Sequence, residues 1–197
     1  MAQNNPNKKT MQTDGSILAT RFNTEKFQLQ RKNHFEIYFG VSVNNEAFID
    51  KDLRFMVVNF PLPKESTESN DVNYFNQTIK TAGRTTFETS NLVLRDAINY
   101  DTEKQFLTWR NKVYNPENGI MGIAADYKLN AKVIEYTPNG EKMRTWKLVG
   151  CWPSGVEYGE LTYDDGGEKQ ISVTITYDYA FRTDLDGADR DTDTYIR

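Results

Sequence analysis

The chain has 197 residues, of which 38% are hydrophobic and 26% charged, and its formal net charge is −4 at pH 7. That length suits one domain with tails, and the acidic balance argues against a protein that coats DNA or RNA. A single cysteine, Cys151, and a single histidine, His34, exclude an internal disulfide, a cysteine metal cage and a histidine-only zinc site.

The first half of the chain predicts a polar arm followed by short strands. Residues 1–32 begin with a polar stretch that lacks periodicity, which is typical of an arm rather than a folded element. Residues 35–43 alternate between apolar and polar side chains and predict a half-buried strand. Residues 53–60 predict a second strand that ends before Pro61 and Pro63. The polar segment 64–73 reads as a surface loop, and 72–81 and 85–95 read as strands around a turn at Ala82-Gly83.

The second half predicts one helix and three clear strands. Residues 101–119 have helical spacing, with Asp101 or Thr102 as cap and Asn115-Pro116 as the end. Residues 131–136 and 142–152 flank Thr137-Pro138-Asn139-Gly140 as a hairpin. Residues 171–181 alternate strictly, so Ile171, Val173, Ile175, Tyr177 and Phe181 should face the core, with Ser172, Thr174 and Thr176 opposite. Together these segments predict a mainly β fold, an antiparallel β-sandwich or barrel with one packed α-helix.

No segment of the sequence indicates catalysis, a cofactor or a metal. His34 has no second imidazole to work with, and Cys151 lies between apolar neighbours with no identifiable base. The acidic stretch 184–193 resembles a calcium loop by composition, but its glycine and glutamate spacing is wrong. We therefore expect no enzyme, no cofactor and no metal site. No apolar run approaches the ~20 residues of a membrane helix, and we expect no stable membrane binding.

Charge is unevenly distributed along the chain. Residues 1–35 carry six basic and two acidic side chains, a net charge of +4, whereas residues 157–197 carry eleven acidic and four basic ones, a net charge of −7. Opposite potentials orient partners, so these ends could serve head-to-tail assembly. The alternative is two solvated tails, which is the usual role of charge runs.

In the C-terminal third, Gly150, Trp152 and Pro153 are followed by the strand that ends in Tyr177-Asp178-Tyr179. This pattern resembles the closing region of the tail tube proteins of contractile phage tails. Upstream, the segment 60–63 resembles the apolar-Pro segment of that family, and Gly83, Arg84 and Phe87 resemble its Gly-Arg-Thr-Phe turn with one extra threonine. We also expect Trp152 to be largely buried and Pro153 to end the pairing of its strand.

The resemblance covers roughly residues 33–181 and implies a structural virion protein. In this family the subunits form hexameric rings, with a continuous inner β-barrel, that stack into the tail tube. The expected partners are other copies of the chain, the tail sheath protein, and the baseplate and tail-terminator proteins. The resemblance further implies that DNA passes through the lumen without specific binding after sheath contraction. It also implies that the protein assembles in the cytoplasm of the host bacterium and then resides in the virion tail.

Two sets of residues are expected at assembly surfaces. The small polar side chains Asn76, Thr78, Glu88 and Ser90 suggest that the predicted hairpin 72–95 lines the channel, although a plain solvated face explains them equally well. The tails outside the family pattern, 1–32 and 182–197, suggest contacts between rings through Lys8, Lys9, Asp184, Asp186 and Asp189.

Two alternatives remain open at this point. Within the same fold, the chain could be a baseplate protein that initiates the tube, or the tube protein of a phage-like injection particle or type VI secretion system. In another class, it could be a β-sandwich that binds carbohydrate or peptide through exposed tyrosine and tryptophan. Negative-stain microscopy separates these readings, because it distinguishes long tubes, single rings and monomers.

Overall fold

The structure is a computed structural model that describes residues 29–42, 47–164 and 166–183. The chain divides after Asn33, and the strands and helices described below all belong to the second unit, which begins at His34. They are, in chain order, β1 (Phe35–Ser42), the 3-10 helix η2 (Lys51–Phe55), β2 (Val57–Asn59), β3 (Glu65–Tyr74), β4 (Gln77–Phe87), β5 (Ser90–Arg95), α2 (Thr102–Val113), β6 (Tyr114–Asn115), β7 (Ile120–Met121), α3 (Ala124–Tyr127), β8 (Leu129–Tyr136), β9 (Lys142–Glu157), β10 (Gln170–Thr176) and β11 (Tyr179–Arg182).

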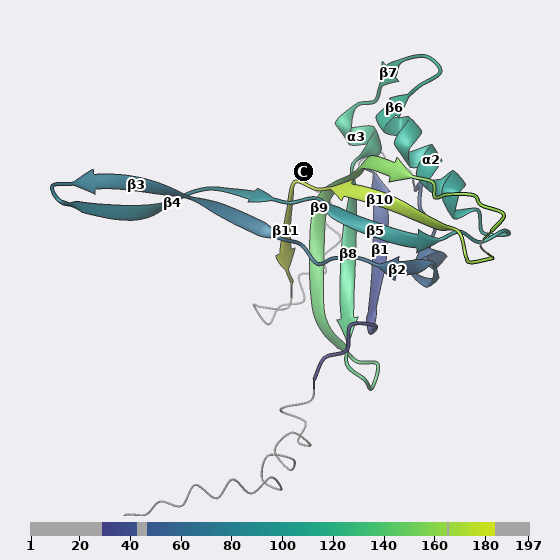
Figure 1. Cartoon of the computed structure of the whole chain (residues 1–197), viewed down its shortest axis with the longest axis horizontal. Coiled ribbons are helices and arrows are strands. Elements are labelled where there is room, and N and C mark those ends of the chain that lie inside the picture. Colours follow the sequence, from purple (N-terminus) through teal and green to yellow (C-terminus); the bar gives the residue numbers. More distant parts are fainter. Residues whose placement is uncertain (1–28, 43–46, 165, 184–197) are drawn as a thin grey trace, which may run out of the picture. The chain divides into compact units, whose positions relative to one another are not determined.

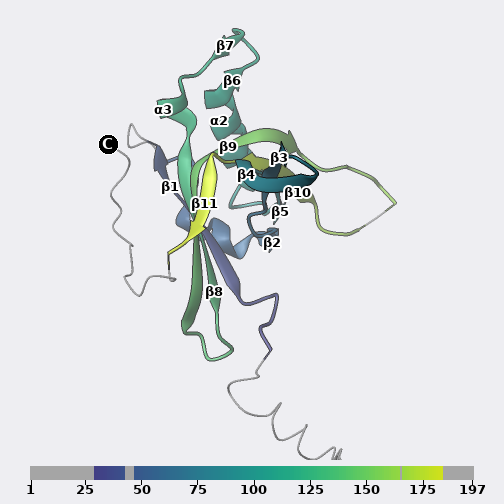
Figure 2. The ribbon, with the colours of Figure 1, turned by 90° about the vertical axis from the view of Figure 1, so that its left-hand side faces the viewer.

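The long strand β9 belongs to two parts of one antiparallel sheet. Its first half pairs with β8 and β11, and β8 also pairs with β1; these strands form sheet A. Its second half pairs with β10, and β10, β5 and β2 follow in order as sheet B. Figures 1 and 2 show the strands of sheet A running across those of sheet B. This is the crossed arrangement in which a corner is made by a strand that switches sheets.

One hydrophobic core lies between the two sheets and helix α2. Sheet B contributes the alternating residues of β5 and β10, and sheet A contributes those of β1, β8 and β9; the buried members include Ile37, Leu92, Leu94, Leu129, Val133, Leu148, Cys151, Ile171, Val173 and Ile175. Helix α2 adds Phe106 and Trp109, and the indole N–H of Trp109 donates to the carbonyl of Tyr127 at 2.7 Å. The prediction of a mainly β fold with a packed helix is confirmed.

Helix α2 begins and ends close to the predicted residues. The Asp101 side chain caps the start by accepting a hydrogen bond from the backbone N–H of Lys104 at 3.1 Å. The helix stops at Val113, because Tyr114 and Asn115 form β6 and pair with β7 before Pro116 is reached. Among the described residues, no helix has the length and apolar character that a membrane crossing requires.

The predicted strand 171–181 is two strands with a corner between them. β10 ends at Thr176 in sheet B, and β11 begins at Tyr179 in sheet A. The bend at Tyr177-Asp178 inverts the alternation: Ile171, Val173, Ile175 and Tyr177 are buried as predicted, but Phe181 is 38% exposed and Ala180 takes its place in the core. The expectation for Phe181 was therefore wrong, because one period-2 pattern cannot continue through a bend that shifts its phase.

The segment 64–95 also differs from the prediction. Residues 65–74 form strand β3 rather than a surface loop, and the turn lies at Phe75-Asn76 rather than at Ala82-Gly83. Gly83 lies within β4, opposite an irregularity in the register between Thr67 and Ser69. The β3–β4 pair is a long two-stranded ribbon that extends away from sheet B (Figure 1). Its strands carry few core residues, so hydrophobic alternation could not reveal them.

Two smaller expectations were partly wrong. The predicted strand 53–60 is a 3-10 helix over Lys51–Phe55 followed by the short strand β2. Pro153 does not end the pairing of β9, since it lies opposite Ile175 and the strand continues to Glu157. A register shift between Thr174 and Ile175 leaves Ser154 as an extra residue, and proline is tolerated at such a bulge.

Candidate assembly surfaces

The corner of β9 is built around Gly150. Its φ angle is 71°, in the left-handed region that favours glycine. The facing residue is Asp178, whose backbone N–H donates to the carbonyl of Val149 at 2.9 Å. Both carboxylate oxygens of Asp178 accept from the Lys128 ammonium, at 2.7 and 2.8 Å. The corner thus joins sheet A, sheet B and the segment before β8.

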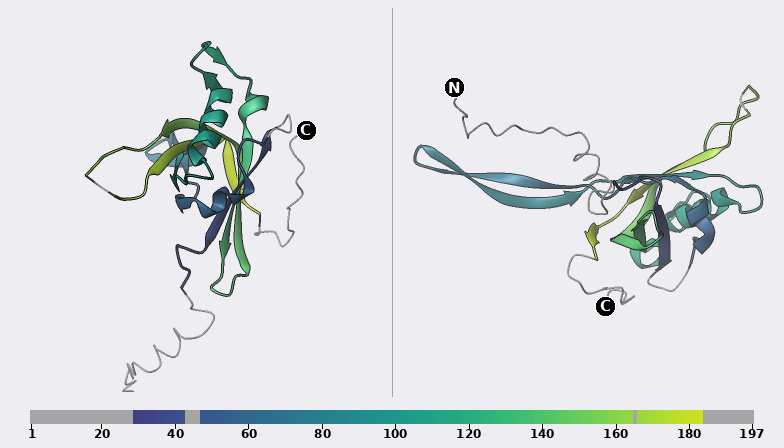
Figure 3. Two further views of the ribbon diagram at one scale, coloured as in Figure 1. Left: turned by 90° about the vertical axis from the view of Figure 1, so that its right-hand side faces the viewer. Right: turned by 90° about the horizontal axis from the view of Figure 1, so that it is seen from below.

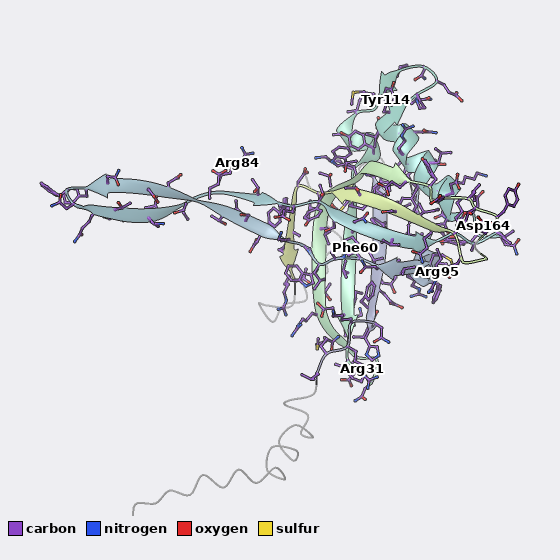
Figure 4. All side chains as sticks on the ribbon, viewed as in Figure 1. Arg31, Phe60, Arg84, Arg95, Tyr114 and Asp164 are labelled. Atoms are coloured by element: carbon purple, nitrogen blue, oxygen red, sulfur yellow. The ribbon has the colours of Figure 1, made fainter. Side chains whose placement is uncertain are left out.

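Most of the residues that carry the family resemblance meet at this corner. Trp152 lies opposite Thr176, Pro153 lies opposite Ile175, and Tyr179 lies opposite Val149. The Phe87 ring, at the base of the ribbon, lies 6.1 Å from the ring of Tyr177. Gly83 and Arg84 lie apart from the corner on β4, and Figure 4 shows Arg84 on the ribbon. These positions shape the subunit and hold no reactive group.

Trp152 is half-buried rather than largely buried. Its ring packs edge-on against Tyr127 with centroids 6.0 Å apart. Tyr179 is exposed and stacks on Phe181 at 6.2 Å, on β11. The corner therefore presents aromatic surface as well as filling the core.

The face of sheet B that points away from the core carries several small polar side chains, beside Val93, Trp152 and Glu157, which lie opposite Ser172 or Thr176. Ser172 donates to Asn91 Oδ1 at 2.8 Å, across β10 and β5. Thr176 donates to the Ser154 hydroxyl at 2.8 Å, across β10 and β9. Thr174 lies between them on the same side of β10, because residues two apart on a strand share a face. This set (Asn91, Ser154, Ser172, Thr174 and Thr176) is called the hydroxyl face below.

The residues expected to line a channel are divided between several environments. Ser90 is 2% exposed and on the core side of β5, so the outward position on that strand belongs to Asn91. Glu88 is exposed and pairs with Lys64 at 2.7 Å at the base of the ribbon. Asn76 forms the ribbon turn, and Thr78 donates to Asn73 Oδ1 at 3.0 Å. The hydroxyl face was not identified from the sequence. The feature that could have indicated it is the row of polar residues Ser172, Thr174 and Thr176 at the outward positions of the strand 171–176.

The β3–β4 ribbon exposes nearly all of its residues. Every residue of β3 is exposed, and β4 has only Gly83 and Phe87 half-buried. Polar side chains elsewhere are less exposed than those of the ribbon. Between η2 and β1, for example, the half-buried Arg54 guanidinium donates to the Tyr38 hydroxyl at 2.7 Å and pairs with Glu36. The backbone hydrogen bonds of the ribbon run between β3 and β4, and its exposed side chains are available to a neighbouring molecule.

Three strands of the main sheet also have an open edge within the described part of the chain. β1 pairs only with β8, β2 only with β5 and β11 only with β9, so each has one edge that pairs with no other strand there. Open edges are templates for pairing with another chain. They are therefore candidate sites for lateral association.

The groups first considered for chemistry occupy structural positions. Cys151 is completely buried, and burial raises the pKa of its thiol to about 12. His34 lies just before β1, where its backbone carbonyl accepts from the N–H of Tyr136. Among the described residues, no group of three or more metal-binding side chains comes together. The stretch 184–193 and the inter-ring residues Lys8, Lys9, Asp184, Asp186 and Asp189 lie outside the described residues.

Comparison with known proteins gives one family and several structures. Residues 32–180 match the family described as T4-like virus tail tube protein gp19. No curated protein matches the sequence. Among solved structures, the chain is similar to the tube-terminating cap of the anti-feeding prophage, with 10% identity, a TM-score of 0.58, and 78% of this chain and 90% of that chain covered.

Two further structures come from the PVC extracellular contractile injection system in its extended state. The sheath/tube terminator is 14% identical with a TM-score of 0.58, and the match covers 77% of this chain and 94% of that one. A chain of the sheath-tube complex is 12% identical with a TM-score of 0.55, and the match covers 83% of this chain and 95% of that one. At these identities the likeness shows a shared fold.

Proposed function

Because the chain belongs to the T4-like virus tail tube protein family, we propose that it is the structural subunit of a tail tube. Copies would associate around an axis as hexameric rings, and the rings would stack into the inner tube of a contractile tail. No chemical step is involved. The work is done by strand pairing within a ring and by contacts between rings.

The β3–β4 ribbon is the observation that carries this proposal. A two-stranded ribbon is only marginally stable in water unless further strands or a packed surface support it. This ribbon has ten residues in β3 and eleven in β4, and apart from Phe87 at its base it lies outside the core of its own subunit. A neighbouring copy would supply the missing surface, and closure into a ring would remove the open edges of β1 and β2. Heterologous contacts of this kind close into rings or continue as filaments.

The hydroxyl face of sheet B suits the wall of a channel for DNA. Its five members, Asn91, Ser154, Ser172, Thr174 and Thr176, are polar and uncharged, and Glu157, which lies opposite Ser172 on the same face, is acidic rather than basic. A basic wall would hold the phosphate backbone through counterion release, whereas neutral hydroxyl and amide groups would not. We propose that this face, together with Asn76, Thr78 and Glu88, lines the lumen, and that the genome passes without specific binding.

The remaining partners follow from the same role. The tube would contact the tail sheath protein on its outside and the baseplate and tail-terminator proteins at its ends, and it would reside in the virion tail after assembly in the host cytoplasm. The basic arm, with Lys8 and Lys9, and the acidic tail, with Asp184, Asp186 and Asp189, would contact each other between rings.

Electron microscopy of the purified protein tests this function. We expect hollow tubes or rings, and a map in which the hydroxyl face points to the axis. Monomers at every concentration, with no tubes or rings, would contradict the proposal. A map with Thr174 on the outer wall would contradict the lumen assignment alone.

A tube protein of an injection particle is the second candidate. The observation in its favour is that the solved structures similar to this chain include parts of the anti-feeding prophage and the PVC system. Tubes that associate with a packaged genome in purified particles would favour the phage role. Tubes of uniform length that contain protein and no DNA would favour the injection particle, and single stable rings would favour a tube initiator.

A further inference from the structure

The face of sheet A that points away from the core carries two lysines directly opposite each other. Lys132 of β8 faces Lys147 of β9 in the ladder. Tyr38 of β1 lies opposite Lys132, and Phe181 of β11 lies opposite Lys147, so the four side chains form one row across the sheet, called the lysine row below. Each member is next in sequence to a core residue, which places the row on the opposite face. These core residues are Ile37, Val133, Leu148 and Ala180.

The lysine row contains two positive charges and no negative one. Directly opposed residues have Cβ atoms about 5 Å apart, and like charges in such positions destabilise a sheet. Glu36 on β1 also points away from the core, but its carboxylate is already engaged. It accepts from the hydroxyls of Tyr38 and Tyr136, at 2.6 and 2.7 Å, and pairs with the Arg54 guanidinium at 3.7 Å. Within the described ranges, Lys147 forms no ion pair. An anionic group over the row would therefore relieve the repulsion.

An acidic segment of the chain begins at the edge of this face. β11 pairs only with β9 among the described strands, so it forms one edge of sheet A, and β1 forms the opposite edge (Figures 1 and 3). Thr183 still belongs to the sheet, because its N–H donates to the carbonyl of Thr145 of β9 at 3.0 Å. The segment 184–197 follows at once; it lies outside the described residues, and its starting point is therefore fixed at the edge of the lysine face.

The charge and the length of the segment 184–197 suit the lysine row. It has five aspartates against two arginines, a side-chain net charge of −3. Three strand spacings, about 15 Å in all, separate β11 from β1, whereas the fourteen residues of the segment can span up to about 46 Å. Asp189, Asp191 and Asp193 occupy every second position, so an extended chain would present their carboxylates on one side, about 7 Å apart. Several carboxylates can thus face the two ammonium groups together.

We propose that the acidic segment 184–197 of each subunit folds back over sheet A of the same subunit and places its aspartates against Lys132 and Lys147. Attachment at the edge of the face keeps the carboxylates at a high effective concentration there, which favours the same chain over a second copy. Exposed ion pairs are individually weak and are screened by salt, so the contact loosens as salt rises. It forms in the single subunit, before the segment meets the basic arm of another ring, and so it goes beyond the proposed tube function.

Zero-length cross-linking of the full chain locates the segment. A carbodiimide joins a carboxylate to an ammonium group only where the two are in contact, and peptide mass spectrometry identifies the pair. A mixture of isotope-labelled and unlabelled chains, treated at low salt while monomeric, should give links from the aspartates of 184–193 to Lys132 or Lys147 that join peptides of the same isotope. Lys80, on β4 of the ribbon, is the internal control and should give no link to this segment.

Two results of the cross-linking would overturn the proposal. Links that join peptides of different isotopes would assign the segment to the lysine row of a second copy. Absence of any link between the segment and Lys132 or Lys147 would leave the row to an anion from outside the chain.

Loss of the two lysines should release the segment. A spin label on Thr192→Cys reports the motion of the segment, because the native Cys151 is buried and unreactive. We expect an immobilised component in the spectrum at low salt, and we expect this component to be lost at high salt and, at any salt, in the double variant K132Q/K147Q. The control K80Q/K104Q removes the same charge from the ribbon and from helix α2 and should retain the component. An immobilised component of equal size in both double variants would contradict the contact.

Electron microscopy of the same preparations separates this contact from the tube function. Tubes without links between the segment and the lysine row would leave the tube function standing and show that the contact is wrong. Links without tubes or rings at any concentration would show the reverse, and absence of both would show that both are wrong.

Discussion

A Cβ atom built on Gly150 lies 2.2 Å from the Oδ2 atom of Asp178, closer than two such atoms approach in real proteins. Asp178 cannot withdraw easily, because its N–H is bonded to Val149 and its carboxylate to Lys128. The left-handed φ of Gly150 and the ion pair between Lys128 and Asp178 therefore depend on each other. The bend of β9 and the bend between β10 and β11 are two sides of one corner.

Gly150→Ala should destabilise the subunit more than Gly140→Ala. Both glycines have positive φ, 71° and 83°, but a Cβ at Gly140 meets nothing within 4 Å. The control thus reports the backbone strain, about 1 kcal/mol or more, and the difference between the variants reports the clash with Asp178. Chemical denaturation measures both. Equal losses for the two variants would show that the corner tolerates a side chain.

Ile175→Ala should lower the free energy of unfolding by about 2–5 kcal/mol, as large-to-small changes in a packed core do. Ile175 is 1% exposed and belongs to the core cluster. Thr174→Ala, one residue away on the hydroxyl face, should change it far less. The order of the two losses is measured by urea unfolding, and the reverse order would mean that the faces of β10 are assigned wrongly.

The buried thiol of Cys151 should make stability fall at alkaline pH. Its pKa is raised to about 12 in the folded chain, chiefly by burial, against an ordinary value of 9.0. The unfolded chain therefore releases this proton first, so the stabilisation is complete below about pH 9 and is lost as pH rises towards 12, by about 1.4 kcal/mol per pH unit. Other groups titrate in the same window, so the quantity to measure is the difference between wild type and Cys151→Ala. A pH-independent difference would contradict this prediction.

Asn91→Lys should convert the hydroxyl face into a DNA-binding wall. Asn91 is exposed on β5, and six copies per ring would place a band of positive charge around the proposed lumen. We expect the variant tubes to retain short DNA fragments, with retention that falls as salt rises because counterion release drives it. Asn118→Lys, on the turn between β6 and β7, adds the same charge elsewhere and is the control. Equal retention by both variants would count against the lumen assignment.

The charged tails should tune the rate of polymerisation. Deleting residues 1–20, or neutralising Asp184, Asp186, Asp189, Asp191 and Asp193, should slow tube growth and make it less sensitive to salt. Exposed ion pairs contribute only about 0–1 kcal/mol each, and screening limits their reach to about 8 Å at physiological salt, so the effect comes from repetition around the ring. Light scattering at low and high salt measures it, and identical kinetics for both variants and the parent would sink the idea.

Sequence alternation predicted the parts of the fold that face the core. β10 was found because Val173 is buried while Ser172 and Thr174 are only half-buried, and β8 and β9 were found because their apolar residues flank the hairpin turn at Thr137-Pro138-Asn139-Gly140. The ribbon could not be found this way, because β3 has no residue in the core and its polar sequence is that of a loop. The corner could not be predicted either. The alternation of buried and exposed residues inverts at Tyr177-Asp178 because the chain bends there opposite Gly150, which is far away in the sequence. The residues of the hydroxyl face on β10 were predicted to point outward. That Asn91 belongs to the same face could not be predicted, because this depends on the pairing of β5 with β10.

Because β9 is shared by both sheets, neither sheet can come apart while the other stays whole. Loss of the β9–β10 pairing would expose Val173 and Ile175, and loss of the β9–β8 pairing would expose Val133 and Leu148 from the same core. Unfolding should therefore be cooperative, without a populated half-open species. At equilibrium such a subunit is either unfolded or completely folded. Few partly folded chains are then present whose exposed strands could pair out of register with a growing polymer.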